Sequence, residues 1–304
     1  MNTLYLHIVY VDKIYISVSV IRGGDNQMNK KKYIALAAVL ILFTGCISQS
    51  DQEKNEGSAG TIQTLTVAGS TTVLPIVQKA AEKYMDMHSD VDIQISGGGS
   101  SVGVQSAGGG TVDIGMASRD MKSEEKSNYP HIQEIAIAKD GIALIIHPSN
   151  PVESLRIEDI VSIYKGDITN WSEVGGADQE IVVVGRDSAS GTREYFWTDV
   201  MKKADFVPIM LEKNSNGAVK QTVSQTPGAV GYVGLGYVDT TIKPLKIDGV
   251  EPTVSNVLNG SYPISRSLYI LIKDNPTDLV KAFIDFLLSR EGQAIVEEEG
   301  FVPL

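Results

Sequence analysis

The residues best suited to chemistry in this chain lie in one short segment, Arg-Asp-Ser-Ala-Ser-Gly-Thr, which runs from Arg186 to Thr192. The segment follows a strand-like apolar run and opens a helix-like stretch. Free N–H groups at a helix start favour an anion; Ser190 and Thr192 add hydroxyl donors, Gly191 admits an anion to the backbone, and Arg186 adds charged donors. Taken alone, the segment is equally compatible with Ser190 as an ordinary N-cap and Arg186 in a surface ion pair.

Three further segments share this arrangement, in which a strand ends, glycine or hydroxyl residues follow, and a helix begins. They are residues 69–72, 97–101 and 118–119. In open α/β sheets, ligands gather beyond the carboxyl ends of strands, where helix N-termini point inward. Each segment alone is more often a plain helix cap, but four together predict a cleft that wraps an oxyanion. The candidate residues are Ser70, Thr71, Thr72, Ser100, Ser118, Arg119, Arg186, Ser190, Gly191 and Thr192.

The hydrophobic periodicity of the chain predicts an α/β fold, in which these four segments are corners between a strand and the helix that follows it. Residues 73–85 show one apolar face at helical spacing, whereas residues 91–96 alternate apolar and polar side chains as a half-buried strand does. The alternation of strands and helices continues along the chain, with a strand predicted at 142–146 and helices at 192–201 and 278–288, and it predicts the α/β class. Proline-rich breaks predict two crossings between lobes separated by a hinged cleft. We expect lobe 1 at 61–147 plus 247–304 and lobe 2 at 148–246.

Composition excludes several classes of partner. The chain has 304 residues and a formal net charge of −11, so nucleic acid is a poor partner for the folded part. Any anion site must therefore act locally, from donors in a dry cleft that salt does not screen. The four histidines are scattered and no calcium-loop pattern occurs, so neither a metal nor another cofactor is predicted.

The N-terminal region resembles a lipoprotein signal. Three lysines, Lys30 to Lys32, precede an apolar run of about 11 residues, which is too short to span a bilayer. Cys46, the only cysteine, ends a lipobox-like sequence and would be lipidated after cleavage. We expect a signal peptide at 28–46, a flexible tether at 47–60, and a location at the extracytoplasmic face of the membrane. Residues 1–27 fit no secretory pattern and are expected to be untranslated or disordered.

Four motifs together resemble the phosphate-binding proteins of phosphate ABC transporters (PstS-like), which have a two-lobed type II periplasmic-binding-protein fold. These motifs are Gly69–Thr72, Gly99–Gly103, Val112–Arg119 and Arg186–Thr192. The resemblance spans roughly residues 61–304. It implies capture of inorganic phosphate outside the membrane, delivery to an ABC permease and its ATPase, and no catalytic step. We also expect a monomer.

The resemblance also implies roles for individual residues. Hydroxyl and N–H groups of residues 70–72 and Ser100 would bind phosphate from lobe 1, and Arg186 with residues 190–192 would bind it from lobe 2. One departure concerns Ser118, because many members have an aspartate next, which accepts the proton of monohydrogen phosphate and repels sulfate. Here Arg119 follows, and then Asp120. Either Asp120 takes that role or Arg119 adds positive charge.

Three alternatives stay open. The first is a receptor for another tetrahedral oxyanion, namely sulfate, molybdate or tungstate. The second is a secreted hydrolase with Ser100 or Ser190 as nucleophile, although the sequence has no G-x-S-x-G motif and no evident histidine base. The third is a sensor or adhesin with the same fold and no role in transport.

Overall fold

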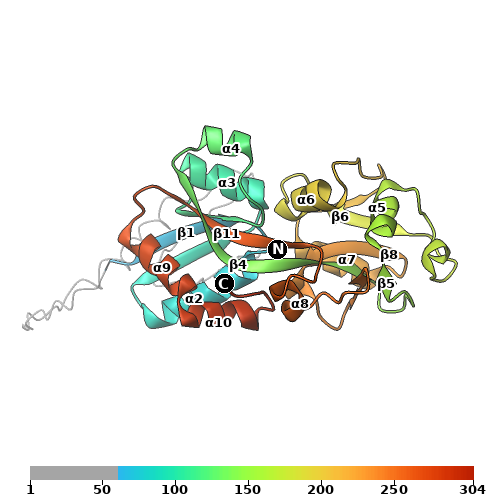
Figure 1. The fold of residues 1–304 in the computed structure, drawn as a ribbon. Coiled ribbons are helices and arrows are strands. Elements are labelled where there is room, and N and C mark those ends of the chain that lie inside the picture. The colour runs from blue at the N-terminus through green and yellow to red at the C-terminus, as the bar shows by residue number, and fades with distance from the viewer. Residues whose placement is uncertain (1–60) are drawn as a thin grey trace, which may run out of the picture. The chain divides into compact units, whose positions relative to one another are not determined.

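A nine-stranded mixed sheet organises residues 61–304, the part of the chain that the computed structural model describes. The predicted signal peptide, Cys46 and the tether lie outside the described residues. The strand order is β2-β1-β3-β11-β4-β8-β6-β7, with β9 paired to β4, and helices cover the sheet in two groups (Figure 1). Within residues 61–304, no helix combines the length and the hydrophobicity that a membrane span requires.

One half of the sheet is built from β1 and its parallel neighbours β2 and β3, with β11 antiparallel beside β3. Apolar side chains of these strands and of α2, α9 and α10 form its core. The elements are β1 (Gln63–Gly69), α2 (Leu74–Met87), β2 (Val91–Ser96), α3 (Ser100–Gly109), β3 (Ile114–Ala117), α4 (Ser123–Asn128), β11 (Ser265–Lys273), α9 (Asp278–Leu288) and α10 (Arg290–Glu298).

The other half is built on β8 and β6, which are parallel, with β7 at the edge. Trp171, Tyr164, Phe196 and Tyr232 lie in its core. Its strands are β5 (Ser154–Leu155), β6 (Val182–Arg186), β7 (Leu211–Lys213), β8 (Ala229–Gly234), β9 (Lys243–Pro244) and β10 (Lys246–Ile247). Its helices are α5 (Ile157–Lys165), η1 (Trp171–Val174), α6 (Gly191–Tyr195), η2 (Phe196–Val200), α7 (Asn216–Gln225), η3 (Leu235–Tyr237) and α8 (Val254–Leu258).

Strand β4 (Ile132–Ile146) belongs to both halves, as Figure 1 shows. Residues 132–141 pair with β11, and residues 142–146 pair with β8. Along β4, Ile137 lies in the core of the first half and Ile142 in the core of the second. Where the chain goes back to the first half, Ile264 still lies in the second core and Leu268 already lies in the first. The two-lobed α/β fold is therefore confirmed. The two cores divide inside β4, about five to ten residues before the sequence-based boundary at 147, and at the start of β11, about 20 residues after the boundary at 246. The lobe boundaries themselves stay a prediction.

Most predicted elements agree with the structure, and two differ instructively. The helix predicted at 278–288 has these bounds, but β4 begins ten residues before the predicted strand at 142–146. Polar residues such as Lys139 and Asp140 interrupt the apolar run and hide the first part of this strand. The helix predicted at 192–201 is α6 followed by the π-helical turn η2, so its axis is not regular throughout.

Candidate functional site

The predicted corners converge on one buried cluster of hydroxyl groups. Thr72, at the β1–α2 corner, and Thr192, at the start of α6, lie with their Oγ1 atoms 3.1 Å apart. Ser100 and Ser118, at two other corners, have Oγ atoms 3.3 Å apart, and the Ser118 N–H donates to Ser100 Oγ at 3.0 Å. All four residues are almost completely buried. Residues from four separate segments thus share a hydrogen-bonded interior.

Gly191 permits this close approach of the two halves. A Cβ atom at this position would overlap Ser100 Oγ and would lie 2.9 Å from Ser118 Oγ. Beside it, the Ser101 N–H donates to the carbonyl of Ala189 at 3.1 Å, which joins the start of α3 directly to the 186–192 segment. The glycine is therefore required by close packing between two segments that meet here.

Two of the predicted serines also accept backbone N–H groups. Ser190 Oγ accepts the Arg193 N–H at 3.2 Å as the N-cap of α6, and Ser70 Oγ accepts the N–H groups of Thr72 and Val73 at 3.2 and 3.4 Å in the turn before α2. The capping interpretation is thus confirmed for Ser190, whereas the N-cap of α2 is Val73 and has no side-chain cap hydrogen bond. A serine hydroxyl that accepts a backbone N–H keeps its own proton for another acceptor.

Arg186 brings a buried charge to the second half of the cluster. The residue is 1% exposed, and its Nε and Nη2 atoms donate to the carbonyls of Lys213 and Asn214 at 3.1 and 3.2 Å. These acceptors are neutral, so they do not cancel the charge. Burial lowers the pKa of Arg186 from its ordinary value. The Arg186 N–H donates to Tyr232, a phenol whose pKa burial raises to about 12, which keeps it neutral.

Arg119, although predicted for the site, directs its guanidinium to Glu125. Nη1 and Nη2 each donate to one carboxylate oxygen at 2.7 Å, and the remaining bonds go to the Asp120 carbonyl and the Ser101 hydroxyl. Burial acts to raise the pKa of Glu125, but the hydrogen bond from Arg119 and the Lys122 N–H hold it below the ordinary value. The structure therefore places Arg119 at the border of the hydroxyl cluster as a neutralised ion pair. Its role as a ligand stays a prediction.

Sequence reasoning assigned no site role to Asn216, whose side chain links the hydroxyls of two threonines. Its Nδ2 lies 3.1 Å from Thr71 Oγ1 and 3.0 Å from Thr72 Oγ1, while its Oδ1 accepts the Gly234 N–H at 3.1 Å. The residue is completely buried. It begins α7 directly after β7 and Ser215, so the same strand-to-helix rule that found the other corners would have found it.

The larger omission is the buried ion pair between Arg266 and Asp140. These residues are directly opposite in the β11–β4 register. Arg266 Nε and Nη2 donate to Asp140 Oδ2 at 3.1 and 2.8 Å, and Asp140 Oδ1 accepts the Leu235 N–H at 2.9 Å. Burial raises the pKa of the Asp140 carboxyl, and Arg266 acts against that rise. Neither residue lies between the end of a strand and the start of a helix, so the pattern that predicted the other site residues could not identify them.

The charges of the cluster favour an anion. Arg186 and Arg266 are both buried, and Asp140 is the carboxylate that pairs with one of them. Asp187, which follows Arg186, is a second nearby carboxylate, but among the described residues the Arg186 guanidinium hydrogen-bonds to neutral carbonyls and forms no ion pair. Because a buried charge is costly unless it is paired, a negatively charged ligand would stabilise this arrangement.

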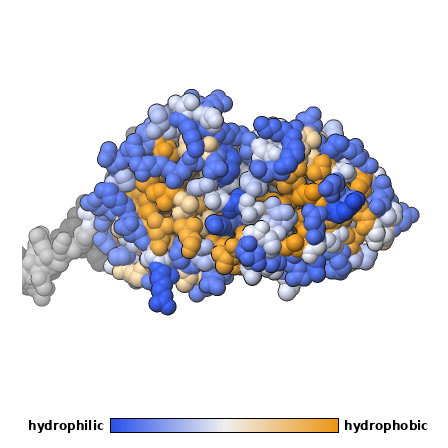
Figure 2. All heavy atoms as spheres, in the orientation of Figure 1, coloured by the Kyte–Doolittle hydropathy of each residue, from blue (hydrophilic) through white to orange (hydrophobic). Residues whose placement is uncertain are grey.

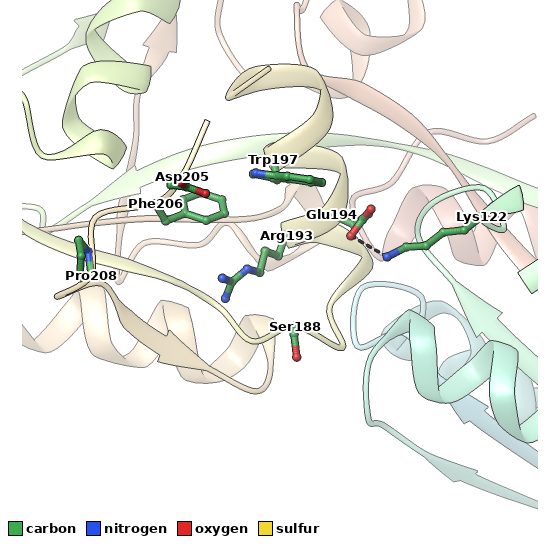
Figure 3. A pocket seen from close by; sticks show the side chains of 8 residues that line it. All are labelled: Lys122, Ser188, Arg193, Glu194, Trp197, Asp205, Phe206 and Pro208. Carbon is green, nitrogen blue, oxygen red and sulfur yellow. Dashed lines mark ion pairs between the residues drawn. The ribbon is translucent and has the colours of Figure 1, made fainter. Parts of the chain in front are cut away.

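An open pocket of about 640 Å³ borders the cluster and shares no residue with it. Figure 3 shows that Lys122 reaches across toward Glu194, with their charged atoms 2.9 Å apart, and that Trp197 and Phe206 line the other side. Figure 2 shows hydrophilic and near-neutral residues at the junction between the two halves. The Lys122–Glu194 pair is 43% and 27% exposed, so it contributes about 0–1 kcal/mol at most.

Neither metal chemistry nor nucleophilic chemistry is supported in the described part of the chain. Residues 61–304 contain no cluster of three or more metal-ligating side chains. The Ser100 hydroxyl bonds to Ser118 and the Ser190 hydroxyl to the Arg193 N–H, and within these residues no histidine is a partner of either. A serine nucleophile would need such a base.

Comparisons with known proteins agree with this geometry. The chain matches the family model of the PBP superfamily domain over residues 54–291. It is 34% identical to the phosphate-binding protein PstS of Bacillus subtilis, over 91% of this chain and 95% of that protein. A putative phosphate ABC transporter substrate-binding protein of Clostridium perfringens, solved with bound phosphate, is 43% identical with a TM-score of 0.77, covering 80% of this chain and 100% of that one. A phosphate transport receptor from Vibrio cholerae is 35% identical with a TM-score of 0.66, covering 79% and 100%.

Proposed function

Because this chain belongs to the PstS-like phosphate-binding proteins of the PBP superfamily, we propose that it is an extracytoplasmic receptor for inorganic phosphate. The proteins of this family bind their ligand and are not enzymes. The observation that carries the proposal is the convergence of hydroxyl-bearing segments from both halves on a buried cluster beside Arg186, whose guanidinium hydrogen-bonds to neutral carbonyls. Such a cluster can replace the hydration shell of a tetrahedral anion.

Phosphate would be bound between the two halves. Its oxygens would accept hydrogen bonds from hydroxyl groups at the corners and from Arg186, with the close approach at Gly191 completing the site. Because these donors come from both halves, the bound anion would favour the form in which the halves are in contact. The donor set is Ser70, Thr71, Thr72, Ser100, Ser118, Ser190, Gly191 and Thr192 together with Arg186.

Isothermal titration of the purified protein with phosphate, sulfate, molybdate and tungstate tests the proposal. We expect tight binding of phosphate and a large loss of affinity in Arg186→Met, since a charged hydrogen bond contributes about 1.5–3 kcal/mol. Arg156→Met is the matched control, because Arg156 is an exposed arginine paired with Asp159. Tight binding of another anion without a phosphate signal would refute phosphate as the ligand.

Another oxyanion, with sulfate first, is the second candidate, and two observations favour it. Both oxygens of Asp140 already accept hydrogen bonds from this chain, and Arg119, which follows Ser118, is paired with Glu125. Arg119 offers no acceptor to the proton of monohydrogen phosphate, and the hydrogen bonds from Arg266 occupy Asp140 Oδ2. A sulfate affinity within about tenfold of the phosphate affinity would show that the site does not discriminate by that proton.

We also propose that the protein is a monomer, is anchored by a lipid on Cys46 and delivers phosphate to an ABC permease and its ATPase. The relatives named for phosphate ABC transport support the delivery role. The sequence around Cys46 supports the anchor. Mass spectrometry of the mature N-terminus tests the anchor: we expect a lipidated Cys46, and an unmodified residue before position 46 would refute it.

A further inference from the structure

Arg266 has a guanidinium nitrogen that the fold leaves without a partner. The residue is 6% exposed, and its Nη1 is buried with no hydrogen-bond partner among the described residues. An unpaired N–H group of a buried cation is costly, and native structures rarely keep one without a reason. The position of this nitrogen relative to the proposed site therefore matters.

The same guanidinium is already bonded to the hydroxyl cluster. Its Nη2 lies 3.0 Å from Thr192 Oγ1 and 3.3 Å from Thr72 Oγ1. Because Nη1 and Nη2 are attached to one planar carbon, Nη1 must lie at the edge of the cluster that holds these two threonines. The free donor is thus adjacent to the hydroxyls that come from both halves of the molecule.

Asp140 explains why a second arginine is tolerated beside Arg186. Burial is the main cause that lowers the pKa of Arg186; Tyr232 and Asp187 act against it, and the charge of Arg266 adds a smaller lowering effect. Asp140 supplies the counter-charge to Arg266 through Oδ2 and is itself fixed by the Leu235 N–H. The ion pair therefore aligns Arg266 and leaves Nη1 as its free donor.

We propose that Arg266 is a second anion-binding arginine, whose Nη1 donates to an oxygen of the bound oxyanion while Nη2 holds Thr72 and Thr192 together. Asp140 is its positioning residue. This inference rests on the proposed function, since it assigns a further ligand to the same site.

The test removes both charges of the pair at once. In the double variant Asp140→Asn plus Arg266→Met, neither buried charge is left without its partner, so folding should be retained. We expect its phosphate affinity in isothermal titration to fall about 10- to 100-fold, the loss of one charged hydrogen bond. The matched double variant Asp159→Asn plus Arg156→Met, at an ion pair outside the site, should bind phosphate about as tightly as wild type.

Thermal unfolding of the free proteins separates a ligand role from a structural one. We expect the Asp140→Asn plus Arg266→Met protein to unfold near the wild-type temperature but to gain much less stability when phosphate is added. A double variant that binds phosphate within about threefold of wild type would overturn the inference and leave the proposed function intact. Wild-type protein that binds no phosphate would instead refute the proposed function.

A single conservative variant covers the case in which the double variant does not fold. Arg266→Lys keeps the positive charge near Asp140, but one ammonium group cannot bridge two hydroxyls and also reach the anion. We expect it to bind phosphate about tenfold more weakly than wild type and more tightly than Arg266→Met. Equal affinity of Arg266→Lys and wild type would overturn the inference.

Discussion

Two arginine–carboxylate pairs, one buried and one partly buried, flank the hydroxyl cluster, and they differ in what the arginine does with its remaining donors. Arg119 pairs with Glu125 and donates its other hydrogen bonds to the Ser101 hydroxyl and the Asp120 carbonyl. Arg266 pairs with Asp140, bonds two threonine hydroxyls and keeps one nitrogen free. An arginine can donate a hydrogen bond to a ligand only where its partners in the fold leave a donor unused. The residue type alone does not decide this.

The two pairs also differ in how the chain brings them together. Glu125 is six residues after Arg119, so this pair forms within one loop and the start of α4. Arg266 and Asp140 are 126 residues apart and meet only because β11 and β4 are in register. The local pair depends on little else in the molecule, whereas the distant pair depends on the central sheet.

The largest difference should appear when one partner is removed. Asp140→Ala leaves a fully buried cation without a counter-charge and should cost about 3–5 kcal/mol of unfolding free energy. Glu125→Ala should cost about 1–2 kcal/mol, because Glu125 is 16% exposed and Arg119 keeps its other acceptors. Urea denaturation of both variants measures this difference. Equal losses would show that burial does not distinguish the pairs.

The contact between the halves can be tested at Gly191. In Gly191→Ala, the added methyl group would overlap Ser100 Oγ and hold the corners apart, so phosphate affinity should fall about 10- to 100-fold. Gly217→Ala is the control, because no other part of the described chain lies within 4 Å of the place its methyl group would take and the residue is in the first turn of α7. Titration of both variants with phosphate checks the prediction, and a Gly191→Ala protein with wild-type affinity would contradict it.

The variant Arg119→Met tests whether the Arg119–Glu125 ion pair contributes to phosphate binding. We expect phosphate affinity to change by less than about fivefold, in keeping with an arginine whose charge Glu125 already neutralises. Surface plasmon resonance or titration would measure the change. A loss as large as that of Arg186→Met would instead support the sequence-based assignment of Arg119 as a direct ligand.

The smallest expected effect concerns acid. The pKa of Glu125 is lower in the folded protein, so its contribution to stability is present above the unfolded pKa of about 4.3 and is lost as pH falls through the folded value. Glu125→Gln should therefore be slightly less stable at neutral pH and should lose less stability between about pH 5 and pH 3. Chemical denaturation across that range checks this. If Glu125→Gln lost as much unfolding free energy over this pH range as wild type, the contribution of the Glu125 carboxylate to stability would be contradicted.

The sequence predicted what local patterns encode. Helix faces and strand alternation located most elements, because burial imposes those periods on the chain. The hydroxyl corners at Thr72, Ser100, Ser118 and Thr192 were found for a related reason: in a parallel α/β arrangement, strand ends meet at one edge. Their meeting is now seen as direct hydrogen bonds between distant segments.

The sequence could not predict contacts that register creates. Asp140 interrupts an apolar run and looks like a break in the strand, whereas it is a completely buried member of β4. Arg266 lies in a strand with no neighbouring motif. Arg119 is the opposite case. Its place after Ser118 predicted a ligand of the anion, but in the structure it forms an ion pair with Glu125. Charge pairing decides such cases, and pairing depends on three-dimensional neighbours.

The shared strand β4 has a consequence for how the protein comes apart. Its two ends are held by ladders in different cores, so loosening either core strips hydrogen bonds from the strand that the other core needs. The two cores should therefore melt as one cooperative unit, and the slowest-exchanging amides should lie along the middle of this strand on both sides of Gly141.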